Sequence, residues 1–134
     1  MTTPPLILIA EDDTDNREGY AEYFAYLGYR VAQAQDGKEA LDAARRLHPD
    51  VILLDLALPI VDGWDVARQV KADPAMRDIL VVALSACVFP GDVERATTAG
   101  CDLFLDKPSY PQDVAETIQR LLDERSAPPG VRRR

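Results

Sequence analysis

The sequence has few of the residues that cross-link a chain or anchor it in a membrane. Its 134 residues include two cysteines, Cys87 and Cys101, which are too few for a disulfide framework. No apolar run approaches the length that spans a bilayer, and Met1–Pro5 lacks the charged start and apolar core of a signal peptide. We therefore expect a cytoplasmic protein without membrane insertion, in which both cysteines stay reduced and act as small hydrophobic residues.

Basic residues are also scarce. Lysine and arginine number 15 against 23 aspartates and glutamates, which gives a formal net charge of −8 and a pI near 4.5. Such a surface repels a phosphate backbone, so we expect no direct nucleic-acid partner, whereas acidic clusters attract divalent cations. His48 is the only histidine of the chain. No partner for it is visible in the sequence, and we interpret it as a solvated loop residue rather than a phosphoacceptor or metal ligand.

Short apolar runs alternate five times with segments of helical periodicity. The runs, predicted to be strands, are Leu6–Ala10, Tyr29–Ala34, Val51–Leu54, Ile79–Leu84 and Asp102–Leu105. The predicted helices run from a cap at Asp13 or Thr14 to Gly28, from Asp36 to about Leu47, from Trp64 to Asp73, from Pro90 to Ala99 and from Pro111 to about Glu124. This alternation predicts a doubly wound α/β domain over residues 1–125, a five-stranded parallel sheet with helices on both faces. Residues 126–134, SAPPGVRRR, are expected to form a disordered tail.

Polar side chains follow four of the predicted strands. Glu11 and Asp12 follow the first, Asp55 ends the third, Ser85 ends the fourth, and Lys107 comes just after the fifth. Because the carboxyl ends of parallel strands lie on one edge of a sheet, these groups are expected to meet there. Hard carboxylate oxygens suit Mg²⁺, while a lysine and a serine hydroxyl can bind phosphoryl oxygens. Asp55 is then the candidate nucleophile.

Taken in order and spacing, the segments ILIAEDD, VILLDLALPIVDG, VVALSA and LFLDKP resemble the receiver domain of two-component response regulators, over roughly residues 6–122. The resemblance implies a stand-alone, single-domain receiver with a flavodoxin-like fold and strand order 2-1-3-4-5. It implies that Asp55 is the phosphoacceptor, assisted by Lys107 and Ser85. It also implies that Mg²⁺ is bound by Asp12 directly, by Glu11 through water, by Asp55, and by the backbone carbonyl of Ala57.

The resemblance further implies how such a protein signals. Ser85 and Phe104 match the switch residues, although an aromatic residue on a strand more often belongs to the core. The phosphoryl group would come from a sensor histidine kinase or a histidine phosphotransfer protein, and the surface of the fourth helix, fifth strand and fifth helix would then bind a downstream protein partner. Such a protein is a regulator, not a conventional enzyme, that catalyses its own phosphorylation and dephosphorylation. Asp13 lies just past the acidic pair and is not counted among the ligands.

Three other functions fit parts of the pattern. A haloacid-dehalogenase type of hydrolase also has a strand-end aspartate but needs a second acid two residues later, where this chain has Ala57. A flavodoxin-like binder needs a hydroxyl- and glycine-rich phosphate loop where this chain has EDDTDN. A phosphate-independent interaction module with the receiver fold is the remaining alternative.

Overall fold

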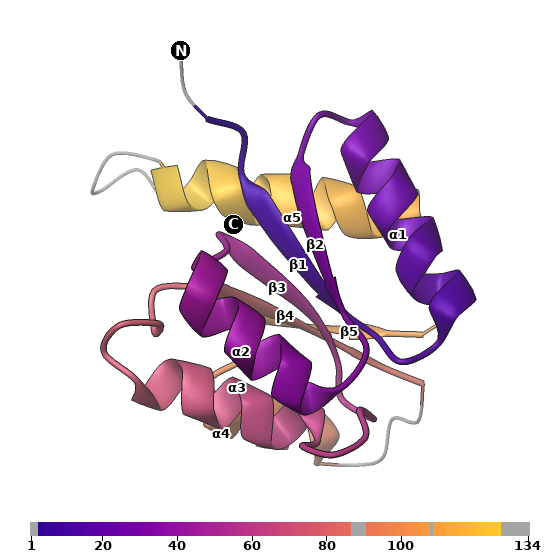
Figure 1. Cartoon of the computed structure of the whole chain (residues 1–134). Coiled ribbons are helices and arrows are strands. Elements are labelled where there is room, and N and C mark those ends of the chain that lie inside the picture. Colours follow the sequence, from indigo (N-terminus) through magenta and orange to yellow (C-terminus); the bar gives the residue numbers. More distant parts are fainter. Residues whose placement is uncertain (1–2, 87–90, 108, 127–134) are drawn as a thin grey trace.

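The computed structural model describes residues 3–86, 91–107 and 109–126. Five strands alternate with five helices (Figure 1). The strands are β1 (Leu6–Ala10), β2 (Arg30–Ala34), β3 (Val51–Asp55), β4 (Leu80–Ser85) and β5 (Leu103–Asp106). The helices are α1 (Thr14–Tyr26), α2 (Gly37–Leu47), α3 (Gly63–Ala72), α4 (Asp92–Ala99) and α5 (Pro111–Ser126). All strand pairs are parallel, and the order β2-β1-β3-β4-β5 confirms the predicted doubly wound sheet.

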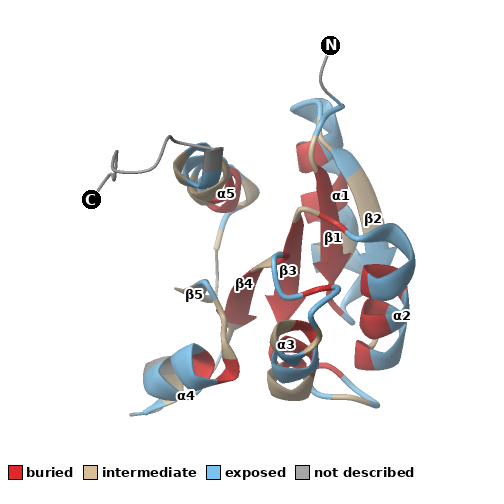
Figure 2. Ribbon diagram, turned by 90° about the vertical axis from the view of Figure 1, so that its left-hand side faces the viewer, coloured by how far each residue is buried: buried red, intermediate tan, exposed pale blue. Residues whose placement is uncertain are grey.

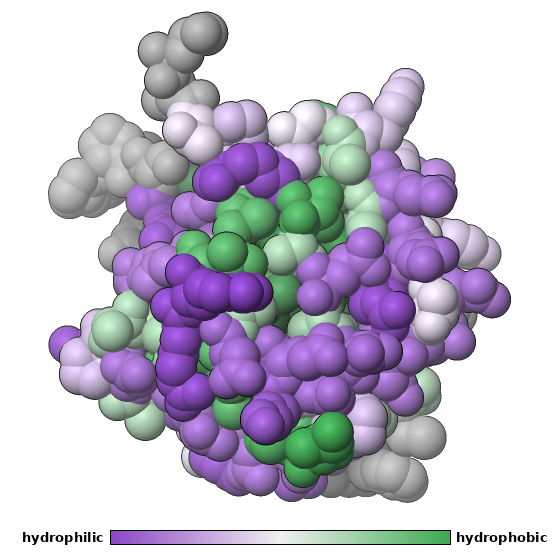
Figure 3. Space-filling model, viewed as in Figure 1, coloured by the Kyte–Doolittle hydropathy of each residue, from purple (hydrophilic) through white to green (hydrophobic). Residues whose placement is uncertain are grey.

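The sheet is buried on both faces, which explains why its central strands read as continuous apolar runs. Alternate residues of each strand point to opposite sides. Leu8, Ile52 and Val81 pack with α2, α3 and α4, whereas Ile9 and Leu53 pack with α1 and α5. Figure 2 shows the resulting pattern, with buried central strands and helices exposed on their outer sides. The face seen in Figure 3 is mainly hydrophilic, in keeping with the high charge of the chain.

Some predicted boundaries were wrong by one or two residues because turns take up the end residues. The amide of Tyr29 donates to the carbonyl of Phe24, so β2 begins at Arg30 instead of Tyr29. The amide of Ile79 donates to the carbonyl of Met76 in a turn, so β4 begins at Leu80. Helix α4 begins at Asp92, and Pro90, where we predicted its start, lies outside the described residues.

Three helices begin with an aspartate cap. The side chains of Asp13, Asp36 and Asp62 each accept a hydrogen bond from the amide three residues later. Asp13 is thereby engaged as the cap of α1.

His48 has a structural partner that the sequence did not reveal. It ends α2 in the left-handed conformation, with φ of 47°, and its Nε2 lies 3.1 Å from Oδ1 of Asp78. His48 is exposed and follows the last residue of α2, which agrees with the prediction of a solvated loop residue, and Asp78 is a neighbour that the sequence did not reveal. The two residues are 30 positions apart, and the fold brings them together at the turns before β3 and β4.

Trp64 and Cys101 are both half-buried beside the core. The guanidinium carbon of Arg95 lies 4.2 Å from the centre of the Trp64 ring, so Trp64 both packs inward and receives a cation from α4. Cys101 is a free thiol. Cys87 lies outside the described residues. The predicted tail of residues 126–134 begins one residue later than expected, because Ser126 ends α5, and residues 127–134 lie outside the described residues. Among the described residues, no helix combines the length and apolar character needed to cross a bilayer.

Candidate functional site

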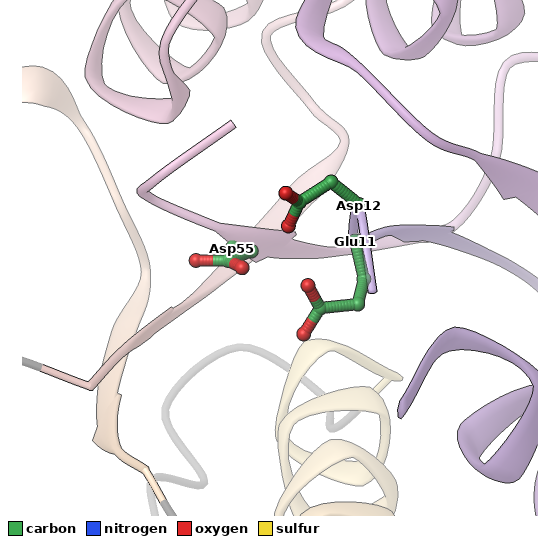
Figure 4. A group of neighbouring side chains, drawn as sticks. All are labelled: Glu11, Asp12 and Asp55. Carbon is green, nitrogen blue, oxygen red and sulfur yellow. The ribbon is translucent and has the colours of Figure 1, made fainter. Parts of the chain in front are cut away.

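Three carboxylates converge where β1 and β3 end. Glu11, Asp12 and Asp55 each offer an oxygen, and these oxygens all lie within 4.8 Å of one another (Figure 4). The convergence follows from topology, because β1 and β3 are parallel neighbours and both are followed or ended by acids. Glu11 and Asp55 are buried, at 2% and 5% exposure, while Asp12 is exposed. The site therefore has two carboxylates that are buried and one that is accessible to solvent.

Lys107 bridges the two buried acids. Its Nζ lies 2.5 Å from Oε1 of Glu11 and 3.1 Å from Oδ2 of Asp55. Burial alone would lower the pKa of Lys107, but its bonds with the two carboxylates outweigh burial and raise it. Burial, helped by the neighbouring Asp55 carboxylate, raises the pKa of Glu11 to about 7 despite the opposing effect of Lys107. A charged lysine thus sits among acids whose mutual repulsion it offsets only in part.

Ser85 lies on β4, the strand next to β3, which ends at Asp55. It is half-buried at the end of β4, in register with Asp106 of β5, and its carbonyl accepts a hydrogen bond of 2.8 Å from the amide of Lys107. The backbone at Leu84 in turn accepts from the amide of Leu56, one residue beyond Asp55. Ser85 and Lys107 are therefore held together at the same edge as the acids.

The loop after Asp55 is fixed by close backbone contacts. The amide of Ala57 donates to Oδ1 of Asp55 at 3.0 Å. A Cβ at Gly63 would lie 2.5 Å from the carbonyl oxygen of Asp55, and one at Gly37 would lie 1.7 Å from that of Val61. Only glycine fits at these two positions, so the starts of α2 and α3 hold the loop in place. The metal contact expected of the Ala57 carbonyl stays a prediction.

Phe104 lies at a position that suits the core. It is half-buried on β5 and packs against the cluster formed by the sheet with α2, α3 and α4. This packing agrees with the expectation that an aromatic residue on a strand belongs to the core. Its part in a switch stays a prediction.

Two residues of α1 that sequence reasoning did not assign to the site also reach it. Tyr20 donates from its hydroxyl to the carbonyl of Ser109 at 2.9 Å, which fastens the chain after Lys107 to α1. Arg17 donates from Nη1 to the carbonyl of Glu11 at 2.9 Å. The only sequence signal for either is its position within two turns of the acidic segment. A cavity of about 380 Å³, lined by Asn16, Tyr20, Ala86, Lys107 and Ser109, lies beside this group.

This donor set fits magnesium. Mg²⁺ prefers oxygen ligands and binds proteins through one or two carboxylates while keeping waters, and three carboxylate oxygens on a partly open site meet that requirement. One ammonium faces three acids, so the site has surplus negative charge that a divalent cation would offset. Lys107 beside Asp55 adds a cation that can pair with a phosphoryl oxygen.

Comparison with known proteins gives a consistent result. Residues 7–119 match the response regulator receiver domain. The polar-differentiation response regulator DivK of Brucella ovis is 36% identical over 118 residues, which cover 88% of this chain and 96% of DivK. The chemotaxis response regulator CheY4 of Vibrio cholerae superposes with a TM-score of 0.83 at 26% identity, covering 89% of this chain and 99% of that one.

A third similar protein bears on the metal. The receiver domain of the sensor histidine kinase PA1611 from Pseudomonas aeruginosa is 32% identical, with a TM-score of 0.81, and the alignment covers 90% of this chain and 98% of that one. That structure holds a magnesium ion coordinated in its active site cleft.

Proposed function

Because the chain belongs to the receiver domain family of response regulators, whose members are phosphoacceptors in two-component signalling, we propose that Asp55 takes the phosphoryl group. The observation that carries this assignment is the position of Asp55, which ends β3 within 4.8 Å of two other acids and 3.1 Å from Lys107. A structural aspartate would gain nothing from such like-charged neighbours. A phosphoacceptor needs them to bind the cation that accompanies a phosphoryl group.

The same residues would hold Mg²⁺. Asp12 and Asp55 would bind it directly, Glu11 through water, and Ala57 through its backbone carbonyl. When bound, the ion offsets the negative charge of the phosphoryl oxygens. Glu11 is buried and already bonded to Lys107, which suits an indirect contact, whereas exposed Asp12 is open to an arriving ion.

In the transfer step, a carboxylate oxygen of Asp55 attacks the phosphorus of a phosphohistidine. The P–O bond to Asp55 forms as the P–N bond breaks, and the electron pair of the P–N bond returns to the imidazole nitrogen, which takes a proton from water. The amide of Ala57 fixes one carboxylate oxygen of Asp55, and Lys107 offsets charge at the other. Positioning and electrostatics thus account for the catalysis, so the protein acts on itself without being a conventional enzyme.

Partners follow from this chemistry. Family membership implies interaction with histidine kinases or phosphotransfer proteins. Once Asp55 carries a phosphoryl group, the Ser85 hydroxyl would be drawn toward a phosphoryl oxygen, and Phe104 would shift with β5. This change would bias the surface of α4, β5 and α5 between two states and so select a downstream protein partner.

The assignment is tested by treating the protein with acetyl phosphate and Mg²⁺ and measuring intact mass. Wild type should gain one phosphoryl group that is stable in acid and lost in base. Asp55→Asn should gain none, while Asp78→Asn, which makes the same charge change at the turn before β4, should label as wild type does. Absence of labelling in wild type would favour a phosphate-independent interaction module.

A further inference from the structure

Arg17 links the acidic segment to two other elements of the fold. From α1, its Nη1 donates to the carbonyl oxygen of Glu11 at 2.9 Å and reaches that of Asp12 at 3.4 Å. Its Nε donates to Oε1 of Gln33 on β2 at 3.1 Å. One planar guanidinium therefore joins α1, the segment after β1, and the adjacent strand.

The carbonyls that Arg17 binds belong to two consecutive residues whose side chains must work together. Successive side chains in an extended segment point to opposite sides, yet the carboxylates of Glu11 and Asp12 both converge on Asp55. The backbone must therefore leave the regular strand geometry between the two residues. Arg17 binds the carbonyl oxygens of both residues, where the chain has left β1 and bends at Asp12.

The bonds of Arg17 go to backbone oxygens, whereas Lys107 pairs directly with the carboxylates of Glu11 and Asp55. The two cations thus contact different parts of the site. Lys107 contacts carboxylates, whereas Arg17 contacts the backbone of the segment that carries Glu11 and Asp12.

We propose that Arg17 is a positioning residue that pre-organises the Glu11 and Asp12 carboxylates for a divalent cation. The inference rests on the cation site of the proposed function and deepens it. Residues that orient metal ligands without touching the metal typically change affinity by about 10- to 100-fold when they are removed. The loss of Arg17 should therefore weaken Mg²⁺ binding by about 10-fold.

Simple electrostatics predicts the opposite sign. Removing a positive charge near a cation site makes its potential more negative, which would tighten Mg²⁺ binding. The direction of the change therefore separates a positioning role from a charge effect, and it does so without reference to phosphorylation.

The experiment is calorimetric titration of the metal-free full chain with Mg²⁺. Arg17→Ala should bind about 10-fold more weakly than wild type, and Arg17→Lys should lie between them because an ammonium can donate to a carbonyl but cannot also span to Gln33. Arg30→Ala is the matched control. It removes the same charge and another bond from an arginine to a carbonyl, that of Nε with Pro4 at 2.8 Å, and should bind as wild type does.

Stability and labelling provide two further readouts. Far-ultraviolet circular dichroism and thermal melts of the metal-free proteins should show Arg17→Ala folded. Should that variant unfold, Gln33→Ala, which keeps Arg17 but removes its second anchor, carries the test and should show a smaller loss of Mg²⁺ affinity. With acetyl phosphate, high Mg²⁺ should restore the labelling rate of Arg17→Ala, because the defect lies in cation affinity.

Mg²⁺ affinity in folded Arg17→Ala that equals or exceeds that of wild type would overturn the inference and leave the proposed function standing. A wild-type protein that binds no Mg²⁺ would overturn the cation site and this inference with it.

Discussion

Lys107 and Lys71 have nearly the same exposure and very different surroundings. Their side chains are 17% and 19% exposed. Lys71, on α3, donates from Nζ to the carbonyls of Ile79 at 2.7 Å and Arg77 at 3.2 Å, and lies 2.9 Å from Oδ2 of Asp102. Lys107 contacts two carboxylates and has a third acid, Asp12, close by.

The difference shows how one fold separates stability from function. At Lys71, one ammonium meets one carboxylate and two carbonyls, and Asp102 also accepts from the amide of Val81 at 2.8 Å. The charges are balanced, and the network ties α3 to the starts of β4 and β5. A Cβ at Gly100 would lie 2.6 Å from Cγ of Lys71, so glycine at the end of α4 leaves room for the Lys71 side chain. At Lys107, one ammonium faces three acids, so negative charge is in excess, which would favour a divalent cation at the proposed site.

The largest expected change in stability comes from breaking the network of Lys71. Lys71→Met should lower the free energy of unfolding by about 2–3 kcal/mol, because it removes the hydrogen bonds of a charged donor and leaves Asp102 without its cation. Urea denaturation measures this. Arg45→Met, which breaks an exposed pair with Asp42 at 3.9 Å, is the control and should change stability by less than about 1 kcal/mol. Equal losses in the two variants would show that the Lys71 network does not stabilise the fold.

Removing one of the carboxylates around Lys107 should instead make the protein more stable. Asp55→Asn should raise the free energy of unfolding in metal-free buffer by about 1–2 kcal/mol, because it removes one of three converging carboxylates while keeping an oxygen for the Ala57 amide. The same urea series measures it, with Asp78→Asn as the control. A less stable Asp55→Asn protein would mean that the acids at this edge are not in excess.

Added magnesium should reduce the difference in stability between wild type and Asp55→Asn. At about ten times its dissociation constant, Mg²⁺ should stabilise wild type by about 1.4 kcal/mol. Asp12→Asn should lose most of this gain, while Asp13→Asn should keep it, because asparagine caps α1 as well as aspartate does and Asp13 is not among the proposed ligands. Thermal melts with and without Mg²⁺ compare the two adjacent acids, and equal gains in both variants would contradict the ligand assignment.

The smallest effect concerns the thiol beside the Lys71 network. Burial, reinforced by the charge of Asp102, raises the pKa of Cys101 to about 11, while Lys71 opposes the shift. At about pH 8, roughly one thiol in a thousand is then ionised, so iodoacetamide should react slowly and the rate should rise steeply toward about pH 11. In Lys71→Met the midpoint should move higher still. A Cys87→Ser background isolates Cys101, and a midpoint at or below that of an ordinary thiol would contradict this assignment.

The sequence was informative where local chemistry determines structure. The apolar runs Leu6–Ala10 and Val51–Leu54 predicted buried parallel strands, and the parallel topology then placed Glu11 and Asp55 on one edge. The predicted start of a helix at Asp36 is confirmed, because the side chain of Asp36 accepts a hydrogen bond from the amide of Glu39.

Contacts between distant residues were not predictable in this way. The pairs of His48 with Asp78, Lys71 with Asp102, and Arg17 with Gln33 depend on how the helices pack against the sheet. No local pattern encodes them, because each joins residues that are far apart in the sequence.

The central claim, that Asp55 accepts the phosphoryl group, is tested most directly by locating the adduct. After reaction with acetyl phosphate and Mg²⁺, hydroxylamine converts an acyl phosphate into a hydroxamate that peptide mass spectrometry can place on one residue. We predict the hydroxamate on Asp55 in wild type and its absence in Asp55→Asn. A hydroxamate on another carboxylate of the wild-type protein, with Asp55 unmodified, would contradict the account.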